Sequence, residues 1–70
     1  MRRSPVGDLK RTLLQSLALT PRPLTEMLAL AGEERVAFFA MIESAYLEIE
    51  DGFVVVNRRG RLALRGIVPL

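Results

Sequence analysis

The stretch that decides the fold is LEIEDGFVVV, residues 47–56. Its first four residues alternate apolar and acidic side chains, and its last four are strong strand formers. Between them stands Asp51-Gly52, a dipeptide typical of two-residue hairpin turns because both residues tolerate positive φ. The stretch therefore predicts a β-hairpin.

A two-residue turn also fixes the register of the two strands. It pairs residue 50 with 53, 49 with 54, 48 with 55 and 47 with 56. Because paired residues share a face, four apolar side chains are predicted on the core face: Leu47, Ile49, Val54 and Val56. The outer face then carries Phe53 and Val55 beside Glu48 and Glu50.

Helical spacing precedes the hairpin. Glu33 and Glu34 open a helix that is predicted to run to about Ala45 and is apolar on nearly all sides. A shorter helix of about nine residues begins near Pro23, with Gly32 as its left-handed cap.

A first helix is predicted from Ser4-Pro5 to about Leu19, with a serine cap and proline in the first turn. The segment Thr20-Pro21-Arg22-Pro23 ends it, because proline breaks the helical hydrogen-bond ladder.

After the hairpin, Asn57 is placed to cap a short helix over residues 58–65, although a further strand in residues 58–70 stays an open alternative. The predicted fold class is α+β and mostly α. Residues 1–70 are expected to form one domain.

Two stretches resemble the winged helix-turn-helix superfamily of bacterial and archaeal regulators. FAMIESAYLEIE, residues 39–50, looks like the end of a recognition helix running into the first wing strand. VVVNRRGRLAL, residues 54–64, is similar to the strand, capping residue and Gly-Arg that follow the wing in MarR-like regulators. The resemblance implies three helices, a hairpin wing and a short C-terminal helix.

The resemblance also implies that the third helix reads bases in the major groove of DNA with residues near its start. The matching positions here are mostly acidic or apolar: Glu33, Glu34, Arg35, Ala37, Phe38, Ala40 and Met41. Only Arg35 suits base readout. The wing tip is reduced to Asp51-Gly52, with no arginine to enter the minor groove. We therefore expect base readout to be slight.

Charge is distributed unevenly along the chain. Residues 1–25 carry a net charge of +4, residues 26–51 carry −6 and the remainder carries +4. The spacing of Arg58, Arg61 and Arg65 lines one side of a helix and suits a phosphate backbone. The predicted nucleic-acid-binding residues are Arg58, Arg59, Arg61, Arg65, Arg2, Arg3, Lys10, Arg11 and Arg35. The alternative is a solvated basic surface.

An apolar fraction of 50% is high for so short a chain, and a helix that is apolar all round must be covered by something. A second hypothesis is therefore a protein-interaction module that docks either on a second copy of itself, as a homodimer, or on a larger complex. Its predicted interface residues are Phe38, Met41, Ala37, Phe53 and Val55. The alternative is that the chain buries these side chains itself.

The composition disfavours other classes of function. Without cysteine or histidine there is no disulfide, no ordinary metal site and no usual nucleophile–base pair, so neither catalysis nor a cofactor is expected. No apolar run approaches the roughly 20 residues of a membrane span, and charges at residues 8, 10 and 11 interrupt any signal peptide. We expect a cytoplasmic binding protein, either a regulator or an accessory factor.

Overall fold

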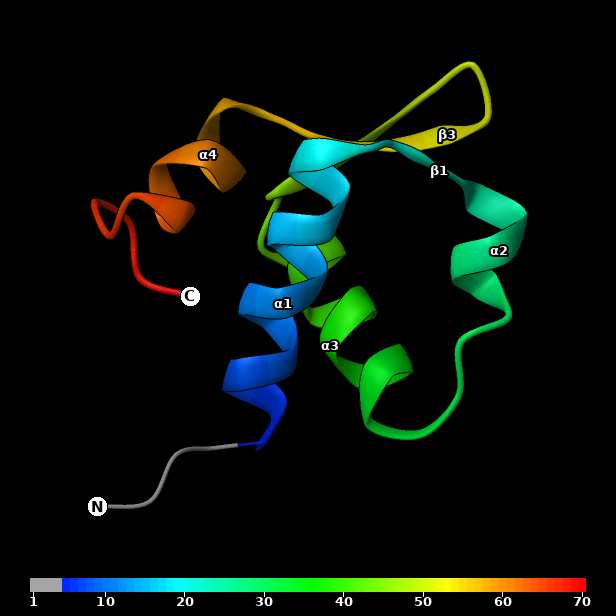
Figure 1. The fold of residues 1–70 in the computed structure, drawn as a ribbon, viewed down its shortest axis with the longest axis horizontal. Coiled ribbons are helices and arrows are strands. Elements are labelled where there is room, and N and C mark those ends of the chain that lie inside the picture. The colour runs from blue at the N-terminus through cyan, green and yellow to red at the C-terminus, as the bar shows by residue number, and fades with distance from the viewer. Residues whose placement is uncertain (1–4) are drawn as a thin grey trace.

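The computed structural model describes residues 5–70, with side chains from Asp8 onward (Figure 1). It is a mostly helical α+β structure whose elements are α1 (Pro5–Leu19), β1 (Arg22–Pro23), α2 (Leu24–Leu28), α3 (Gly32–Glu43), β2 (Leu47–Glu50), β3 (Phe53–Val56) and α4 (Arg58–Leu64). The strands form an antiparallel sheet in the order β1-β3-β2. This order of elements is compatible with a winged-helix layout.

The β2–β3 hairpin has the predicted turn and the predicted register. Residues 47, 48, 49 and 50 pair with 56, 55, 54 and 53. Asp51 and Gly52 have φ values of 52° and 78°, as a type I′ turn requires. This register places all four predicted residues on the core face, as expected. Leu47, Val54 and Val56 are buried there, whereas Ile49 is 46% exposed because β2 is an edge strand with a neighbour on one side only.

Strand β1 was not predicted. Its two residues lie in the proline-containing segment that ends α1, and they pair with β3 as Arg22 with Val54 and Pro23 with Phe53. Proline favours extended backbone and lacks an N–H, which an edge strand tolerates. The amide of Leu24 then donates to the carbonyl of Gly52 at 2.8 Å, so the hairpin turn is tied to the start of α2.

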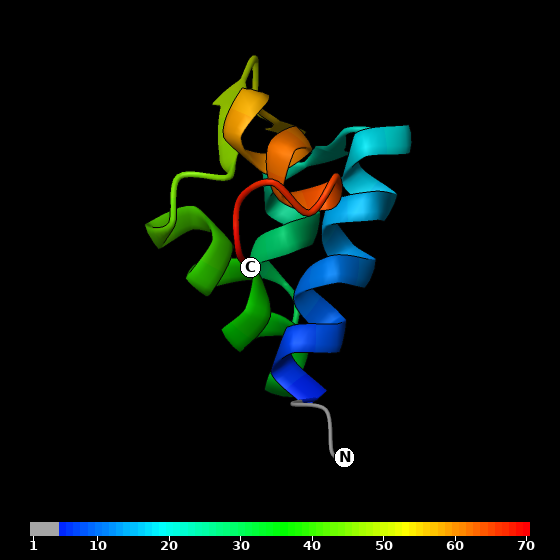
Figure 2. The same cartoon turned by 90° about the vertical axis from the view of Figure 1, so that its left-hand side faces the viewer.

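The helices cover one face of the sheet. In Figures 1 and 2, α1 and α3 run side by side below the strands. The fully buried large side chains come from α1, α2, α3 and β3: Leu14, Leu17, Met27, Phe38, Met41 and Val54. No described element covers the other face of the sheet, which we call the outer face; it carries Pro23, Phe53, Val55, Glu48 and Glu50.

The helix boundaries differ modestly from those predicted. Helix α2 has five residues rather than about nine, and only Met27 of its apolar residues is buried. Gly32 has the predicted left-handed conformation, with a φ of 63°, but it is the first residue of α3 and not the cap of α2, whose C-cap is Ala29. Helix α3 ends at Glu43. The predicted cap Ser4 lies outside the described residues.

The question left open for residues 58–70 is answered by α4, which Asn57 caps as predicted. The Asn57 side-chain oxygen accepts from the amide of Gly60 at 2.9 Å. The start of α4 also holds the loop between α3 and β2. The three successive carbonyls of Ser44, Ala45 and Tyr46 accept from Arg59 Nε at 3.1 Å, Asn57 Nδ2 at 2.6 Å and the Asn57 amide at 3.2 Å.

Candidate binding surfaces

The exposed face of α3 differs from the predicted one. Ala37, Phe38 and Met41 are at most 1% exposed and face the core, because α3 packs along α1 through these residues. The prediction that they form a partner interface is therefore wrong. Val36, 56% exposed, and Phe39, 36% exposed, take their place on the surface. Sequence reasoning missed both because a helix that is apolar all round gives its periodicity no preferred side.

Arg35, the basic residue predicted for base readout, contacts its own chain. Its Nη1 donates to the carbonyl of Leu28 at 2.7 Å, and its guanidinium lies 4.9 Å from the centre of the Phe39 ring. The carbonyl belongs to the last residue of α2, so Arg35 complements that end of the helix. Only part of its hydrogen-bonding capacity is left for a ligand.

The surface of α3 and the hairpin is acidic, and we call it the acidic side. It carries six exposed carboxylates: Glu33, Glu34, Glu43, Glu48, Glu50 and Asp51. None of them forms an ion pair within the described part of the chain, where Arg22 and Glu26 pair at 3.4 Å on β1 and α2. Phosphates brought to this side would be repelled.

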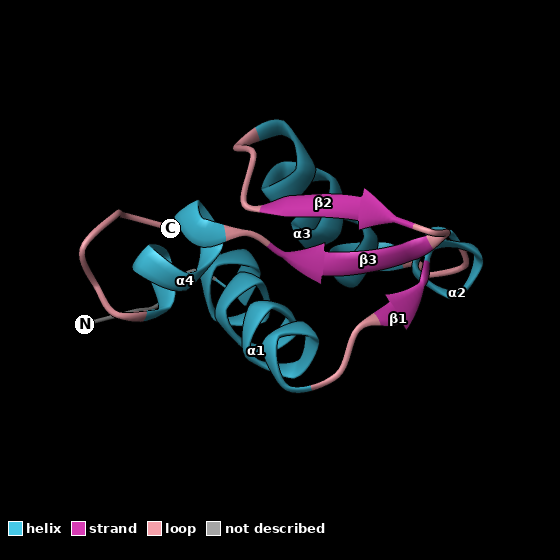
Figure 3. Ribbon diagram, turned by 90° about the horizontal axis from the view of Figure 1, so that it is seen from above, coloured by secondary structure: helices cyan, strands magenta, loops and turns pink. Residues whose placement is uncertain are grey.

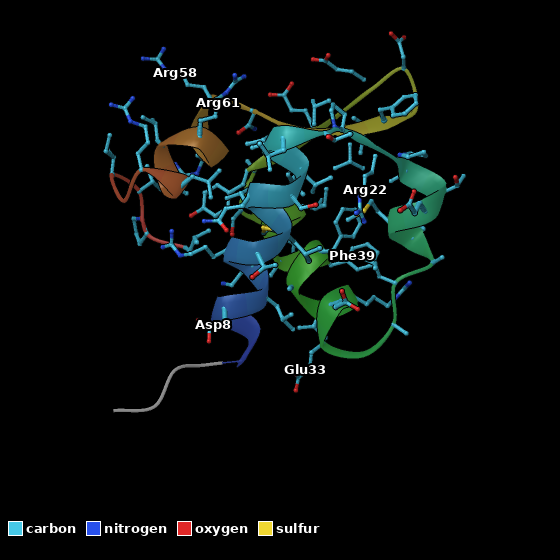
Figure 4. The ribbon with its side chains drawn as sticks, viewed as in Figure 1. Asp8, Arg22, Glu33, Phe39, Arg58 and Arg61 are labelled. Atoms are coloured by element: carbon cyan, nitrogen blue, oxygen red, sulfur yellow. The ribbon has the colours of Figure 1, made fainter. Side chains whose placement is uncertain are left out.

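The three arginines of α4 and Arg65, which ends it, fall into two groups. Arg59 donates to Ser44 and lies 5.4 Å from the centre of the Tyr46 ring, so it serves the fold. Arg61 reaches the carbonyl of Val56 at 3.4 Å. For the exposed Arg58 and Arg65, no side-chain bond is formed among residues 8–70. In Figure 4, Arg58 and Arg61 both project from α4 away from the core.

Helix α1 lies beside α4 and adds to its charge (Figure 3). Lys10 Nζ donates to the carbonyl of Leu70 at 3.4 Å, and Arg11 is exposed. Together α1, α4 and the residue that ends α4 carry six basic side chains and one acidic one, Asp8: Lys10, Arg11, Arg58, Arg59, Arg61 and Arg65. We call this the basic side. The predicted residues Arg2 and Arg3 lie outside the described residues.

The outer face of the sheet has an apolar centre and a pocket. Phe53 is 45% exposed and Val55 is half-buried. Beside Val55, where α1 ends and α4 begins, is a pocket of about 110 Å³ lined by Leu17, Ala18, Pro21, Val55, Val56 and Arg61. The structure therefore keeps two of the five predicted interface residues, Phe53 and Val55, at the surface.

Among the described residues, no group of three or more histidine, cysteine, aspartate or glutamate side chains is arranged to hold a metal ion. None of the helices in residues 5–70 combines the length and apolar character needed to cross a bilayer.

Comparison of the chain with protein-family models, curated proteins and solved structures gives no match.

Proposed function

We propose that this protein is a small winged-helix nucleic-acid-binding protein, a regulator or accessory factor, that holds the phosphate backbone with its basic side. The observation that carries the proposal is the segregation of charge. Helices α1 and α4 gather the basic residues that are far apart in sequence, while α3 and the hairpin hold the acidic ones. The order helix, strand, two helices and hairpin supports the winged-helix assignment.

The mode of binding that we propose differs from the usual winged-helix mode. An α3 with Glu33, Glu34 and Val36 on its surface offers phosphates repulsion and offers base edges few donors. Exposed arginines at the spacing of Arg58 and Arg65, by contrast, can neutralise phosphates and release counterions without reading sequence. Binding is therefore expected to depend strongly on salt and weakly on base sequence.

The test is fluorescence anisotropy with a labelled DNA duplex at several salt concentrations. The double variant Arg58→Gln/Arg65→Gln removes two cations from the basic side and leaves Arg61, which lines the pocket, in place. Each lost phosphate contact should lower the slope of log K against log salt by about 0.9 and weaken binding at low salt.

The matched control is Arg22→Gln, which removes the same unit of charge beside Glu26 and away from the basic side. It should leave the salt slope nearly unchanged. The proposal fails if the wild-type chain binds no duplex at low salt. An equal loss per charge in Arg22→Gln would show that net charge, not the basic side, governs binding.

A further inference from the structure

The outer face of the sheet combines a protruding ring and a recess on one strand. Phe53 and Val55 are two positions apart on β3, so the exposed ring and the edge of the pocket are separated by about 7 Å along the strand. Pro23 lies opposite Phe53 on β1 and extends the apolar centre of the face. A 70-residue chain buries a small fraction of its surface on folding, so covering this apolar face would add to its stability.

Charged residues border this apolar centre with opposite signs on its two sides. On β2, Glu48 lies opposite Val55 and Glu50 lies opposite Phe53, so both carboxylates share the outer face. At the pocket, on the α4 side, stands Arg61, which projects upward beside Arg58 in Figure 4. The outer face is therefore self-complementary. Its exposed ring could fill its own kind of pocket on a second copy, and its carboxylates could pair with Arg61 there.

We propose that a second copy of this chain covers the outer face in a two-fold symmetric dimer. A two-fold axis that lies between the two sheets and runs obliquely to their strands places the hairpin end of one face over the α4 end of the other, and the β2 margin of one toward the pocket margin of the other. Phe53 of each copy then enters the pocket beside Val55 of the other. Glu50 of each copy approaches Arg61 of the other. Such reciprocal contacts are what an isologous interface requires.

The pocket suits this occupant in size and in chemistry. Its volume of about 110 Å³ is comparable with the apolar cavity of about 150 Å³ that accepts a benzene molecule in another protein. Five of its six lining residues are apolar: Leu17, Ala18, Pro21, Val55 and Val56. Arg61 is placed to meet a carboxylate next to the incoming ring. An aromatic residue flanked by an acidic one fits this combination.

The first test measures mass by sedimentation equilibrium over a hundredfold range of protein concentration. Wild type should change from monomer to dimer within that range. Phe53→Ser should raise the dimer dissociation constant at least tenfold. The matched control is Phe39→Ser, which removes a comparably exposed ring on α3 and should leave the constant unchanged. Circular dichroism of each variant checks that it is folded.

The second test exchanges the charges. Glu50→Arg and Arg61→Glu should each weaken the dimer, and the double variant should restore it, because each new arginine then meets a new glutamate across the two-fold axis. Three results would overturn the proposal: a monomeric wild type, an equal loss in Phe39→Ser, or a double variant weaker than both single ones. Assembly beyond the dimer would exclude the two-fold arrangement.

The dimer does not depend on nucleic-acid binding. Arg58→Gln/Arg65→Gln should keep the wild-type dimer mass, and Phe53→Ser should keep its salt-dependent DNA binding per chain. Loss of the dimer in the first variant would mean that the basic side as a whole, rather than Arg61 and the pocket, joins the copies.

Discussion

Gly60 lies where α4 closely approaches the backbone that leads into β2. A Cβ at this position would lie 2.5 Å from the carbonyl oxygen of Tyr46 and 2.7 Å from Cγ1 of Val56. The first neighbour is backbone and cannot move away cheaply. The sequence identifies this glycine only as a residue in the first turn of a helix. The lack of space for a side chain there results from tertiary packing, which leaves no local pattern in the sequence.

Gly60→Ala should therefore lower the free energy of unfolding by about 2 kcal/mol, the range for an overpacked core, even though alanine favours helix over glycine. The comparison is Gly66→Ala, where φ is 80° but no heavy atom lies within 4 Å of the added Cβ. That variant should cost only about 1 kcal/mol from the left-handed backbone. Urea denaturation measures both, and a larger loss in Gly66→Ala would contradict the argument.

At the scale of the elements, the sequence predicted most reliably the structure that local chemistry determines. Asp51-Gly52 and the alternation before it predict the hairpin and its register, and Asn57 predicts the start of α4. Strand β1 could not be predicted because two residues are too few to show the alternation of a strand. The buried side of α3 could not be predicted either, because only contact with α1 decides which of its apolar residues are buried.

Two neighbouring phenylalanines can show which side of α3 faces the core, because Phe38 is buried and Phe39 is partly exposed. Phe38→Ala empties a fully buried site and should lower the free energy of unfolding by about 3 to 5 kcal/mol. Phe39→Ala removes a partly exposed ring that contacts Phe38 edge-on and should cost less than half as much. Chemical denaturation of the two variants provides the measurement. Equal losses would mean that Phe39 is as deeply packed as Phe38.

At the scale of the whole molecule, the two charged sides result from the way in which the chain folds. The sequence alternates basic, acidic and basic segments, which by itself places no charges side by side. Packing of α4 against α1 joins the two basic segments. The sequence thus predicted which residues are charged, and the tertiary contacts determine which of them can act on one ligand.

If the outer face is covered by a second copy, stability should depend on concentration. Association of folded chains stabilises them by mass action, so the midpoint of thermal unfolding should rise as the protein is concentrated. Phe53→Ser should remove this dependence and leave a lower, constant midpoint. Differential scanning calorimetry at a series of concentrations is the measurement. A wild-type midpoint that stays constant would count against the dimer.

The three carbonyls of residues 44–46 that the start of α4 holds have a mechanical consequence. Ala45 has a φ of 62°, a conformation that is costly for an alanine. Residues 44–46 join α3 to the hairpin, so a hinge between the two would be located here. Asn57 and Arg59, which follow the hairpin, donate hydrogen bonds to the carbonyls of all three residues. These bonds restrict rotation of the hairpin relative to α3. The hairpin, α3 and α4 should therefore move as one rigid body. A ligand that displaces the arginines of α4 should displace the end of α3 with them.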